Sequence, residues 1–360
     1  SVLILLILGL IFSLKRVKFN FTFLVYLLLL LLGIILTKVP EGESLRNAIS
    51  FNLSGPLVLG FSAIYLYKRD IKQGELLDVL YFMLLPLLSM VVYLYFRTPD
   101  LSEIVFKSNA NFKTSGGFGP NQVSTAIGLG IFILTVFLIL KYKFSGFLIF
   151  DSLILIYFIF RGLLTFSRGG IITGLIAIIA FFLLYAFYQR NAIAIVFKFL
   201  LLGSILSLSV WVYTSDITGG MLNNRYSGKN SLGEQREDVT TGRLKIITKQ
   251  LKSFMNQPLG IGVGNGKFKR QSSIESVTAA SHNEIGRLLE EHGFLGFILL
   301  LILIFAPLSF FLENLNIHLA YLISFYILWF LTVNHSAMRI AFPGFIYGLS
   351  LINIINNDEK

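Results

Sequence analysis

The sequence predicts an all-α protein, a polytopic bundle of transmembrane helices with one large folded loop. Of its 360 residues, 55% are hydrophobic and only 14% are charged, and the mean hydropathy is +0.76. A soluble domain of this length could not bury so much apolar surface. Long apolar runs recur along the chain, and a helix needs about 20 such residues to cross a bilayer. Because the chain has no cysteine, structural disulfides and thiolate zinc sites are excluded.

Eleven apolar runs are each expected to form one transmembrane span. The first run is short and does not begin with methionine. We therefore expect the chain to start inside a longer helix, with a cleaved signal segment as the alternative. The full chain is expected to have eleven or twelve spans. The runs cover residues 1–14, 19–37, 51–67, 76–96, 121–140, 144–165, 169–188, 192–212, 293–312, 318–334 and 341–356.

Basic residues fall in the short connections after the first, third, fifth and seventh runs. Since positive charge favours the cytoplasmic side, these connections should be cytoplasmic, and parity then places the loop 97–120 and the long segment 213–290 outside. The net charge of +11 is thus explained by topology and by contacts with anionic head groups or phosphates, without nucleic-acid binding. The basic residues that set this orientation are Lys15, Arg16, Lys18, Lys68, Arg69, Lys72, Lys141, Lys143 and Arg190.

The predicted organisation along the chain follows from this topology. Residues 1–212 should form the first eight transmembrane helices, with a smaller outer loop at 97–120. Residues 213–290 should form a large periplasmic loop, and residues 291–360 the last three transmembrane helices. The large loop should be folded, because turn residues alternate in it with a clear helical pattern.

A helix is predicted in this loop, ending before Pro258. Its apolar positions recur at steps of three and four residues, and Thr240 or Thr241 can cap its start. Lysines repeat on another face with the same period, so the helix is amphipathic and should lie on the outer leaflet. The apolar positions are Leu244, Ile247, Leu251 and Phe254, and the lysines are Lys245, Lys249 and Lys252.

Glycines alternate in the segment 260–264, which follows this helix and reads Gly-Ile-Gly-Val-Gly. The segment is not a dinucleotide-binding fingerprint, because no strand, turn and helix unit surrounds it. Alternating glycines let the backbone take positive φ angles and let other groups come close. The segment is interpreted either as a tight turn under the membrane helices or as a place of close approach for a ligand or a helix.

Arg168 lies in the sequence Phe-Ser-Arg-Gly-Gly at residues 166–170, between two apolar runs. The two runs together are too long for one helix, so Arg168 should lie at an outer turn or just inside it. A charge near membrane depth is costly and is normally retained for a polar pathway or an anionic ligand. The planar guanidinium matches phosphate well. The alternative is an interfacial arginine that reaches lipid phosphates.

Five short motifs follow one another along the chain. They are Gly119-Pro120-Asn121, Ser167-Arg168-Gly169, Thr241-Gly242-Arg243, Gly260-Ile261-Gly262-Val263-Gly264, and His282-Asn283 followed after nine residues by Gly293-Phe294-Leu295-Gly296. In this order they resemble the bacterial O-antigen polymerase and O-antigen ligase superfamily. The resemblance covers residues 119–312 by motif and the whole chain by span count and loop placement.

This resemblance implies an inverting glycosyltransferase of the GT-C type in the bacterial inner membrane. Its donor would be a glycan linked to undecaprenyl pyrophosphate at the periplasmic face, and its acceptor another glycan or the lipid A core. A chain-length regulator or a flippase could be a further partner. By resemblance, His282 stands at the position of the catalytic histidine, and histidine suits a general base because its pKa is near the working pH. The alternative is a histidine at a helix start, bonded to the neighbouring backbone.

Arg168 and Arg243 are the candidates that would hold the pyrophosphate, since arginine can stabilise a departing diphosphate without a metal. No Asp-x-Asp pair occurs in the outer loops, so we expect no metal site, no cofactor and metal-independent catalysis. Weaker candidates for binding pyrophosphate or glycan are Arg287, Asn283, Arg225, His335 and Arg339.

Arg287 has a second interpretation. If residues 281–296 are helical, its guanidinium can pair with Glu284, Glu290 or Glu291 at three- or four-residue spacing. In that case Arg287 would stabilise the helix and would not bind a ligand.

Other polar residues are also open to two interpretations. His335 and Arg339 could line the same cavity as the site residues or could cap the end of a helix. Glu41 and Glu43, in the first outer loop, are second candidates for the general base, against a solvated turn around Pro40.

Three classes of function are compatible with these observations. The leading class is transfer of a lipid-linked glycan, and a polymerase is favoured over a ligase because its acceptor is a molecule of the same lipid class and requires no extra recognition domain. A transporter or flippase for lipid-linked sugars would show inverted repeats and charges near the midplane, whereas no internal repeat is found and the polar residues cluster at one face. A noncatalytic scaffold would leave the arginines and the histidine unexplained.

Overall fold

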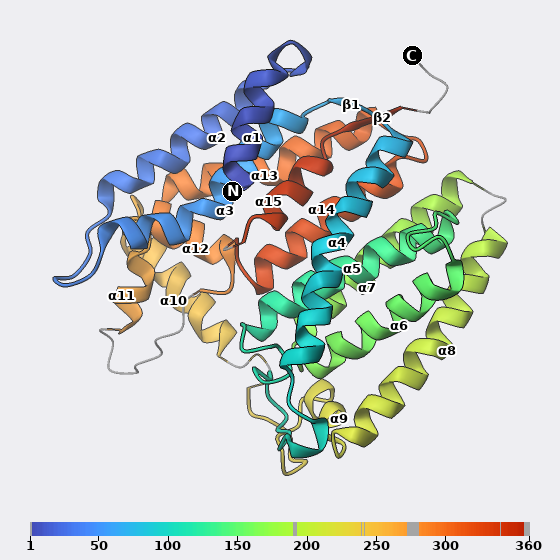
Figure 1. Cartoon of the computed structure of the whole chain (residues 1–360). Coiled ribbons are helices and arrows are strands. Elements are labelled where there is room, and N and C mark those ends of the chain that lie inside the picture. The colour runs from blue at the N-terminus through green and yellow to red at the C-terminus, as the bar shows by residue number, and fades with distance from the viewer. Residues whose placement is uncertain are drawn as a thin grey trace. The chain divides into compact units, whose positions relative to one another are not determined.

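Helices dominate the computed structural model (Figure 1), in agreement with the predicted helical bundle. The structure describes residues 2–189, 193–238, 240, 242–271, 281–338 and 340–355. By their internal contacts the residues form two units. The first unit comprises Ser1–Ile71 and Thr240–Ile354, and the second comprises Lys72–Val239 with Ile355–Lys360.

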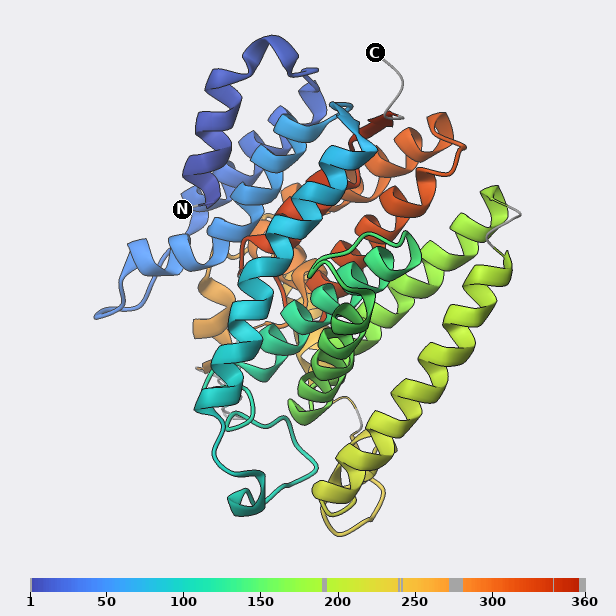
Figure 2. The same cartoon turned by 45° about the vertical axis from the view of Figure 1, so that its right-hand side comes forward.

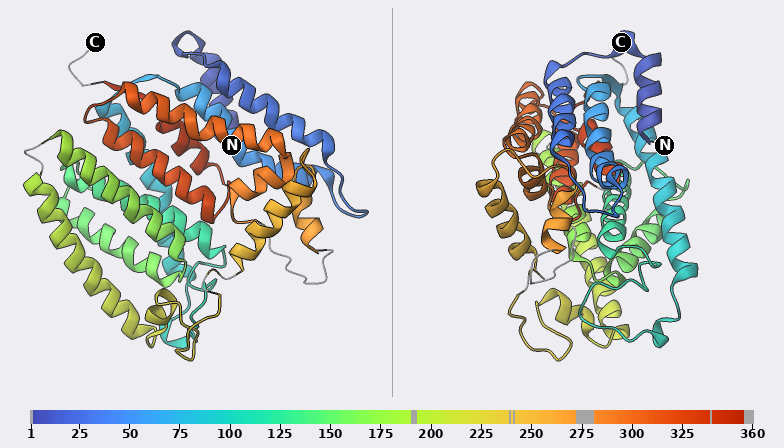
Figure 3. Two further views of the ribbon diagram at one scale, coloured as in Figure 1. Left: turned by 180° about the vertical axis from the view of Figure 1, so that it is seen from behind. Right: turned by 90° about the vertical axis from the view of Figure 1, so that its left-hand side faces the viewer.

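The first unit is built from both ends of the sequence. Its helices are α1 (Val2–Phe12), α2 (Phe21–Leu32), α3 (Leu45–Leu66), α10 (Arg243–Asn256), α11 (Asn265–Gln271), α12 (Glu284–His292), α13 (Phe294–Glu313), α14 (Leu319–His335) and α15 (Phe342–Leu349), with 3-10 turns at Leu14–Arg16 and Gly33–Leu36. Helix α3 packs against α1, α2 and α15. Helix α13 lies along α2, as Figure 3 shows from behind. Apolar side chains with small residues between them let these helices come close.

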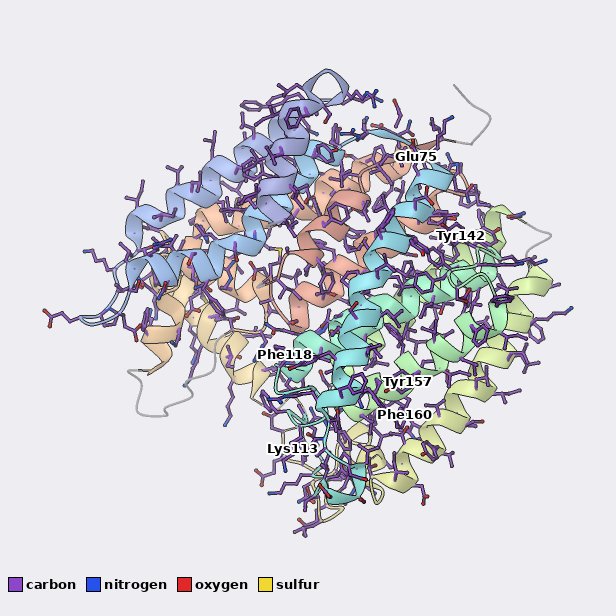
Figure 4. All side chains as sticks on the ribbon, viewed as in Figure 1. Glu75, Lys113, Phe118, Tyr142, Tyr157 and Phe160 are labelled. Atoms are coloured by element: carbon purple, nitrogen blue, oxygen red, sulfur yellow. The ribbon has the colours of Figure 1, made fainter. Side chains whose placement is uncertain are left out.

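The second unit has α5 at its centre. Its helices are α4 (Gln73–Arg97), α5 (Pro120–Ile139), α6 (Leu148–Leu164), α7 (Arg168–Tyr188), α8 (Ile193–Ile217) and α9 (Met221–Tyr226), with a 3-10 turn at Leu101–Glu103. Helix α5 contacts α4, α6 and α7, while α8 lies beside α6 (Figure 2). In the most apolar 18-residue stretch of α8, only 11% of the residues are buried within the protein. Most of this helix is therefore available for contact with lipid. Tyr142 and Lys113 mark opposite ends of this unit in Figure 4.

Each of the eleven predicted runs contains a helix. Among the described residues, six helices are long and apolar enough to cross a membrane. They are α3, α4, α5, α7, α13 and the part of α8 from Val196 to Ile217. Three shorter apolar helices cover Val2–Phe12, Phe21–Leu36 and Leu319–His335. The multi-pass membrane character is therefore supported, and the number of eleven spans stays a prediction.

The last predicted run does not remain helical to residue 356. Helix α15 ends at Leu349, and strand β2 (Asn353–Ile355) then pairs with strand β1 (Asp70–Lys72). The Lys68 amide donates to the Leu351 carbonyl at 2.7 Å, and the Asn353 amide donates to the Arg69 carbonyl at 2.9 Å. Isoleucines in the segment 352–355 favour an extended backbone once a partner strand is present. This pairing with a distant segment is a long-range contact, which an apolar run does not reveal.

The basic connections of the first unit lie together at one end, as the parity of the predicted spans requires. Lys18 forms an ion pair with Asp70 at 3.0 Å, and Lys68 forms one with Glu313 at 2.5 Å. These pairs join the connections after the first, third and ninth predicted runs, all assigned to the cytoplasmic side. The sidedness of this end in a cell stays a prediction.

We predict that Gly128→Val destabilises the second unit. A Cβ at Gly128 would lie 2.2 Å from the carbonyl oxygen of Gly170 on α7, so a side chain there would force α5 and α7 apart. Overpacking of this kind costs ~1–3 kcal/mol or more. Thermal unfolding of the detergent-solubilised protein should show a lower melting temperature. Gly203→Val is the matched control, because nothing lies within 4 Å of a Cβ at Gly203 on α8; equal melting of both variants would contradict the close contact of α5 and α7.

Candidate functional site

His282 and Asn283 lead directly into α12 in the first unit. Asn283 caps this helix, with its side-chain oxygen accepting from the Gly286 amide at 2.7 Å. Its side-chain amide donates to the Asn334 side-chain oxygen at 3.0 Å, which ties the start of α12 to the end of α14. His282 itself is half-buried. The structure therefore places the predicted histidine on a fixed helix entry rather than on a loose loop.

Helix α10 supports this entry from the side. The Gln250 side-chain amide donates to the Ser281 hydroxyl at 3.0 Å and to the Glu290 carboxylate at 3.2 Å. A Cβ at Gly286 would lie 2.3 Å from the Gln250 side-chain oxygen, so a larger residue there would displace the Gln250 amide. Gln250 is buried. One polar side chain of α10 thus fixes both ends of the segment around His282.

The start of α10 differs in detail from the prediction. The helix begins at Arg243 with Gly242 as its cap, in the left-handed conformation at φ 83°. The Thr240 hydroxyl accepts from the Leu244 amide at 3.4 Å, and Thr241 lies outside the described residues. The helix ends at Asn256, before Pro258 as predicted.

The apolar positions predicted for α10 are not the buried ones. Its buried residues are Ile246, Gln250 and Ser253, whereas Leu244 and Leu251 are exposed. An open apolar face is what a helix on a membrane surface requires.

His335, at the end of α14, shares an electrostatic neighbourhood with Arg243 and His282. Burial lowers the pKa of His335 to about 4; the Leu331 carbonyl opposes this shift, while Arg243 and His282 add to it. The ring nitrogen Nδ1 lies 2.7 Å from the Leu331 carbonyl, so it carries the proton, and the ring is neutral at pH 7. His335 therefore both caps its helix and lies near the site residues. Arg339 lies outside the described residues.

Arg287 forms the ion pairs that its helical spacing allows. It is 2% exposed, and its guanidinium donates to Glu291 at 2.6 Å and to Glu284 through two nitrogens, one of them at 3.0 Å. Burial alone would lower the pKa of Arg287, but the carboxylates of Glu284 and Glu291 raise it above its ordinary value. Glu290, the third predicted partner, accepts from Gln250 instead. Arg287 therefore braces α12.

The glycine segment 260–264 is a tight turn against helix ends. Gly260, Gly262 and Gly264 have φ angles of 90°, 89° and 79°, which favour glycine. The Ile261 amide donates to the Glu290 carbonyl at 3.1 Å and the Gly262 amide to the Glu291 carbonyl at 3.0 Å. The turn thus satisfies carbonyls at the end of α12 that the helix itself leaves open. The tight turn is observed, and so is the close approach of a helix, since a Cβ at Gly260 would lie 2.5 Å from the Glu291 carbonyl oxygen of α12.

In the second unit, hydrogen bonds join two of the motifs. The Ser167 hydroxyl donates to the Asn121 side-chain oxygen at 2.8 Å, and the Ser124 hydroxyl donates to Ser167 at 2.9 Å. Arg168 is the first residue of α7 and is half-buried. It lies at a turn between two helices, as predicted, and the start of α5 holds that turn.

Arg225 supports the same turn from α9. Its Nε donates to the Phe166 carbonyl at 3.0 Å, and Phe166 has a φ of 56°, an uncommon value for a non-glycine residue. Burial raises the pKa of Tyr226 to about 12, and Arg168 and Arg225 oppose this shift. Both arginines therefore lie near the Tyr226 hydroxyl, and Arg225 positions the backbone that precedes Arg168.

Sequence reasoning missed Arg161. It is 3% exposed, and its Nη2 donates to the Leu94 carbonyl, the Thr98 hydroxyl and the Thr114 carbonyl at 3.0, 2.6 and 3.0 Å. It thereby joins α6 to the end of α4 and to the loop 97–120. A lone arginine inside the apolar run 144–165 is a signal that could have identified it.

The early carboxylates lie in a solvated turn. Glu41 and Glu43 are both exposed, and the Glu43 amide donates to the Pro40 carbonyl at 3.1 Å.

Within the first unit the structure groups Arg243, His282 and His335, and Asn283 forms hydrogen bonds that support them. Within the second unit it groups Arg168 and Arg225.

Comparison with known proteins agrees with the motifs. A family model described as O-antigen ligase matches residues 152–301, from α6 into α13. The match confirms the resemblance to the O-antigen polymerase and ligase superfamily and supports a membrane enzyme of that kind. No individual curated protein matches the sequence.

We predict that Arg287→Gln strongly destabilises the protein. The substitution leaves Glu284 and Glu291 buried without their cation, and breaking such a pair costs ~3–5 kcal/mol. The melting temperature should fall, and adding Glu284→Gln and Glu291→Gln should restore most of it. Arg46→Gln, at an exposed position on α3, is the control. If Arg287→Gln melts like the control, Arg287 does not brace α12.

We also predict that stability falls as the pH is lowered below about 6.5. Burial lowers the pKa of His292 to about 3, with Arg287 adding to the shift, so the unfolded chain binds a proton that the folded chain excludes. At pH 5 this one group should cost ~2 kcal/mol. In melting curves between pH 7 and pH 5, His292→Leu should show a smaller decrease than the unmodified protein. Identical slopes would show that His292 is not buried in its neutral form.

Proposed function

We propose that this chain, whose residues 152–301 resemble the O-antigen ligase family, is an integral membrane glycosyltransferase. It would move a glycan from undecaprenyl pyrophosphate to an acceptor sugar hydroxyl at the periplasmic face of the inner membrane. We favour a polymerase of O-antigen or another surface polysaccharide, with another lipid-linked repeat unit as the acceptor.

The grouping of His282, Arg243 and His335 in one electrostatic neighbourhood carries this proposal. A base and a cation are the two groups that the reaction needs close together. Burial and hydrogen bonds hold the surrounding polar residues, so the groups would need little rearrangement during the reaction. His335, neutral at pH 7, would polarise the site without adding a charge.

In the proposed reaction, the acceptor oxygen attacks the anomeric carbon of the donor. The bond from that carbon to the phosphate oxygen breaks, and the pyrophosphate lipid leaves with the electron pair. His282 takes the proton of the acceptor hydroxyl as general base. Arg243 binds the developing charge on the diphosphate with a bidentate fork of donors. Inversion at the anomeric carbon follows from a single displacement.

In the second unit, Arg168 is proposed as a residue that binds phosphate. It lies at the start of a long helix, where backbone amides favour anions. Asn283, Arg225 and Arg287 act in this scheme by holding the backbone or the helix, rather than by touching the substrate.

A ligase is the second candidate, and the description of the matching family favours it. It would transfer the same donor glycan to the lipid A core. The polymerase remains our first choice because its acceptor belongs to the same lipid class as its donor. A flippase for lipid-linked sugars is a more distant alternative.

We predict that His282→Ala lowers transfer by ~100-fold or more, the usual effect of removing a general base. Arg243→Lys and Arg168→Lys should also lower transfer at least tenfold, because a point charge cannot replace the bidentate fork. The rate of transfer from purified lipid-linked donor in detergent is the measurement, with melting curves to show that each variant is folded. Arg46→Lys, at an exposed position, is the control. Unchanged rates for His282→Ala, or for both arginine variants, would refute the assigned roles.

We predict that the products identify the acceptor. Incubation with the lipid-linked repeat unit alone should give a ladder of longer chains on the pyrophosphate lipid. Capped core, formed only when lipid A core is added, would identify a ligase instead. A chelator should leave the rate unchanged in either case. Inhibition that magnesium or manganese reverses would contradict metal-independent transfer.

A further inference from the structure

A cavity of about 360 Å³ lies in the first unit beside the entry to α12. Its walls come from the start of α3, from α11 and from α12, and Ser281 is part of its lining. Ser281 is the residue before His282, so the cavity adjoins the proposed base along the chain. Its volume is within the range of ~300–1,000 Å³ that is usual for small-molecule sites.

Among the described residues, the charges that line the cavity balance. Glu43 at the exposed rim and Glu291 at the buried wall are acidic, while Lys267 and Arg287 are basic. Arg287 is already neutralised by its ion pairs with carboxylates. A diphosphate needs an excess of cationic groups, and the described lining residues offer none. Its chemistry fits a neutral, polar ligand.

The other lining groups are those that bind sugars. Phe51, which is 53% exposed, and Phe268 supply aromatic rings on which the C–H face of a sugar can pack. Asn47 and Asn52 supply side-chain amides that can both donate to and accept from hydroxyls. The Glu43 carboxylate can accept from further hydroxyls. Aromatic rings beside amides and a carboxylate suit a sugar better than a purely apolar or purely ionic molecule.

The buried wall of the cavity is held in place. The Glu291 carboxylate accepts from Arg287 at 2.6 Å and from the Gly264 amide. Gly264 belongs to the glycine turn, where a Cβ would lie 3.0 Å from the Ala48 carbonyl of α3. The same ion pair that braces α12 therefore also shapes this wall.

We propose that this cavity binds a neutral sugar of the acceptor glycan and so presents the attacking hydroxyl to His282. The proposal rests on the proposed function for the identity of the sugar as acceptor. The binding of sugar in the cavity can be tested without any transfer reaction.

The test is saturation-transfer NMR on the whole protein in a detergent without a sugar head group, since a maltoside would compete. The probes are N,N′-diacetylchitobiose, cellobiose and maltotriose, with inorganic pyrophosphate as competitor. We expect signals from at least one of these sugars, reduced at least fivefold in Phe51→Ala and in Asn47→Ala. Both positions are exposed, so these variants should fold. Phe112→Ala, at a 60% exposed position in the second unit, is the matched control and should bind normally.

Pyrophosphate and Arg243→Lys should leave the sugar signals unchanged. Signals from none of the sugars, equal signals in Phe51→Ala and Phe112→Ala, or competition by pyrophosphate would overturn the proposal. If the protein binds sugar but shows no transfer, the proposed sugar site stands and only the proposed enzyme function is refuted. In an active enzyme, Phe51→Ala should raise the KM for the acceptor at least fivefold with little change in kcat, and an unchanged KM would show that the bound sugar is not the acceptor.

Discussion

The buried ion pairs of Arg287 with Glu284 and Glu291 are the interaction on which the first unit depends most. Three charged side chains with almost no exposure can remain on α12 only because they pair with one another. Glu284 also accepts from the Met338 amide at 3.3 Å, and Glu291 accepts from the Gly264 amide. Helix α12 is thereby joined to the segment after α14 and to the glycine turn. The orientation of its first residues, including the proposed base, follows from these contacts.

Much of the fold can be predicted from the sequence because apolar runs report helices directly. The run 121–140 predicts α5, which covers Pro120–Ile139, and the run 169–188 predicts α7, which covers Arg168–Tyr188. The end of the chain is different, since strand β2 forms only because Lys68 and Arg69, far away in sequence, offer it backbone partners. The amphipathic pattern predicts α10 correctly but not its buried face, which contains Gln250. A polar residue is buried there because its partners are in place, and no periodicity shows those partners.

The candidate site is predictable to the extent that its contacts are local. The pairing of Arg287 with Glu284 and Glu291 follows from helical spacing, and the cap at Asn283 lies beside its helix. The bond from Asn283 to Asn334 and the nearness of His335 to Arg243 depend on how α10, α12 and α14 pack. Spacing along the chain carries no information on that packing. The motifs identify which residues matter, and the packing gives each its contacts.

The discontinuity of the first unit has a consequence for how the protein is made. Helix α3 packs against α15, and most of the chain is synthesised between the two. Synthesis proceeds at about 5–20 residues per second, so α15 is made on the order of ten seconds or more after α3. The second unit lies between them in sequence, so its helices can meet while the ribosome is still at work. Helix α3 can pack against α1 and α2 early, but the face that contacts α15 must avoid wrong partners until α15 has been made.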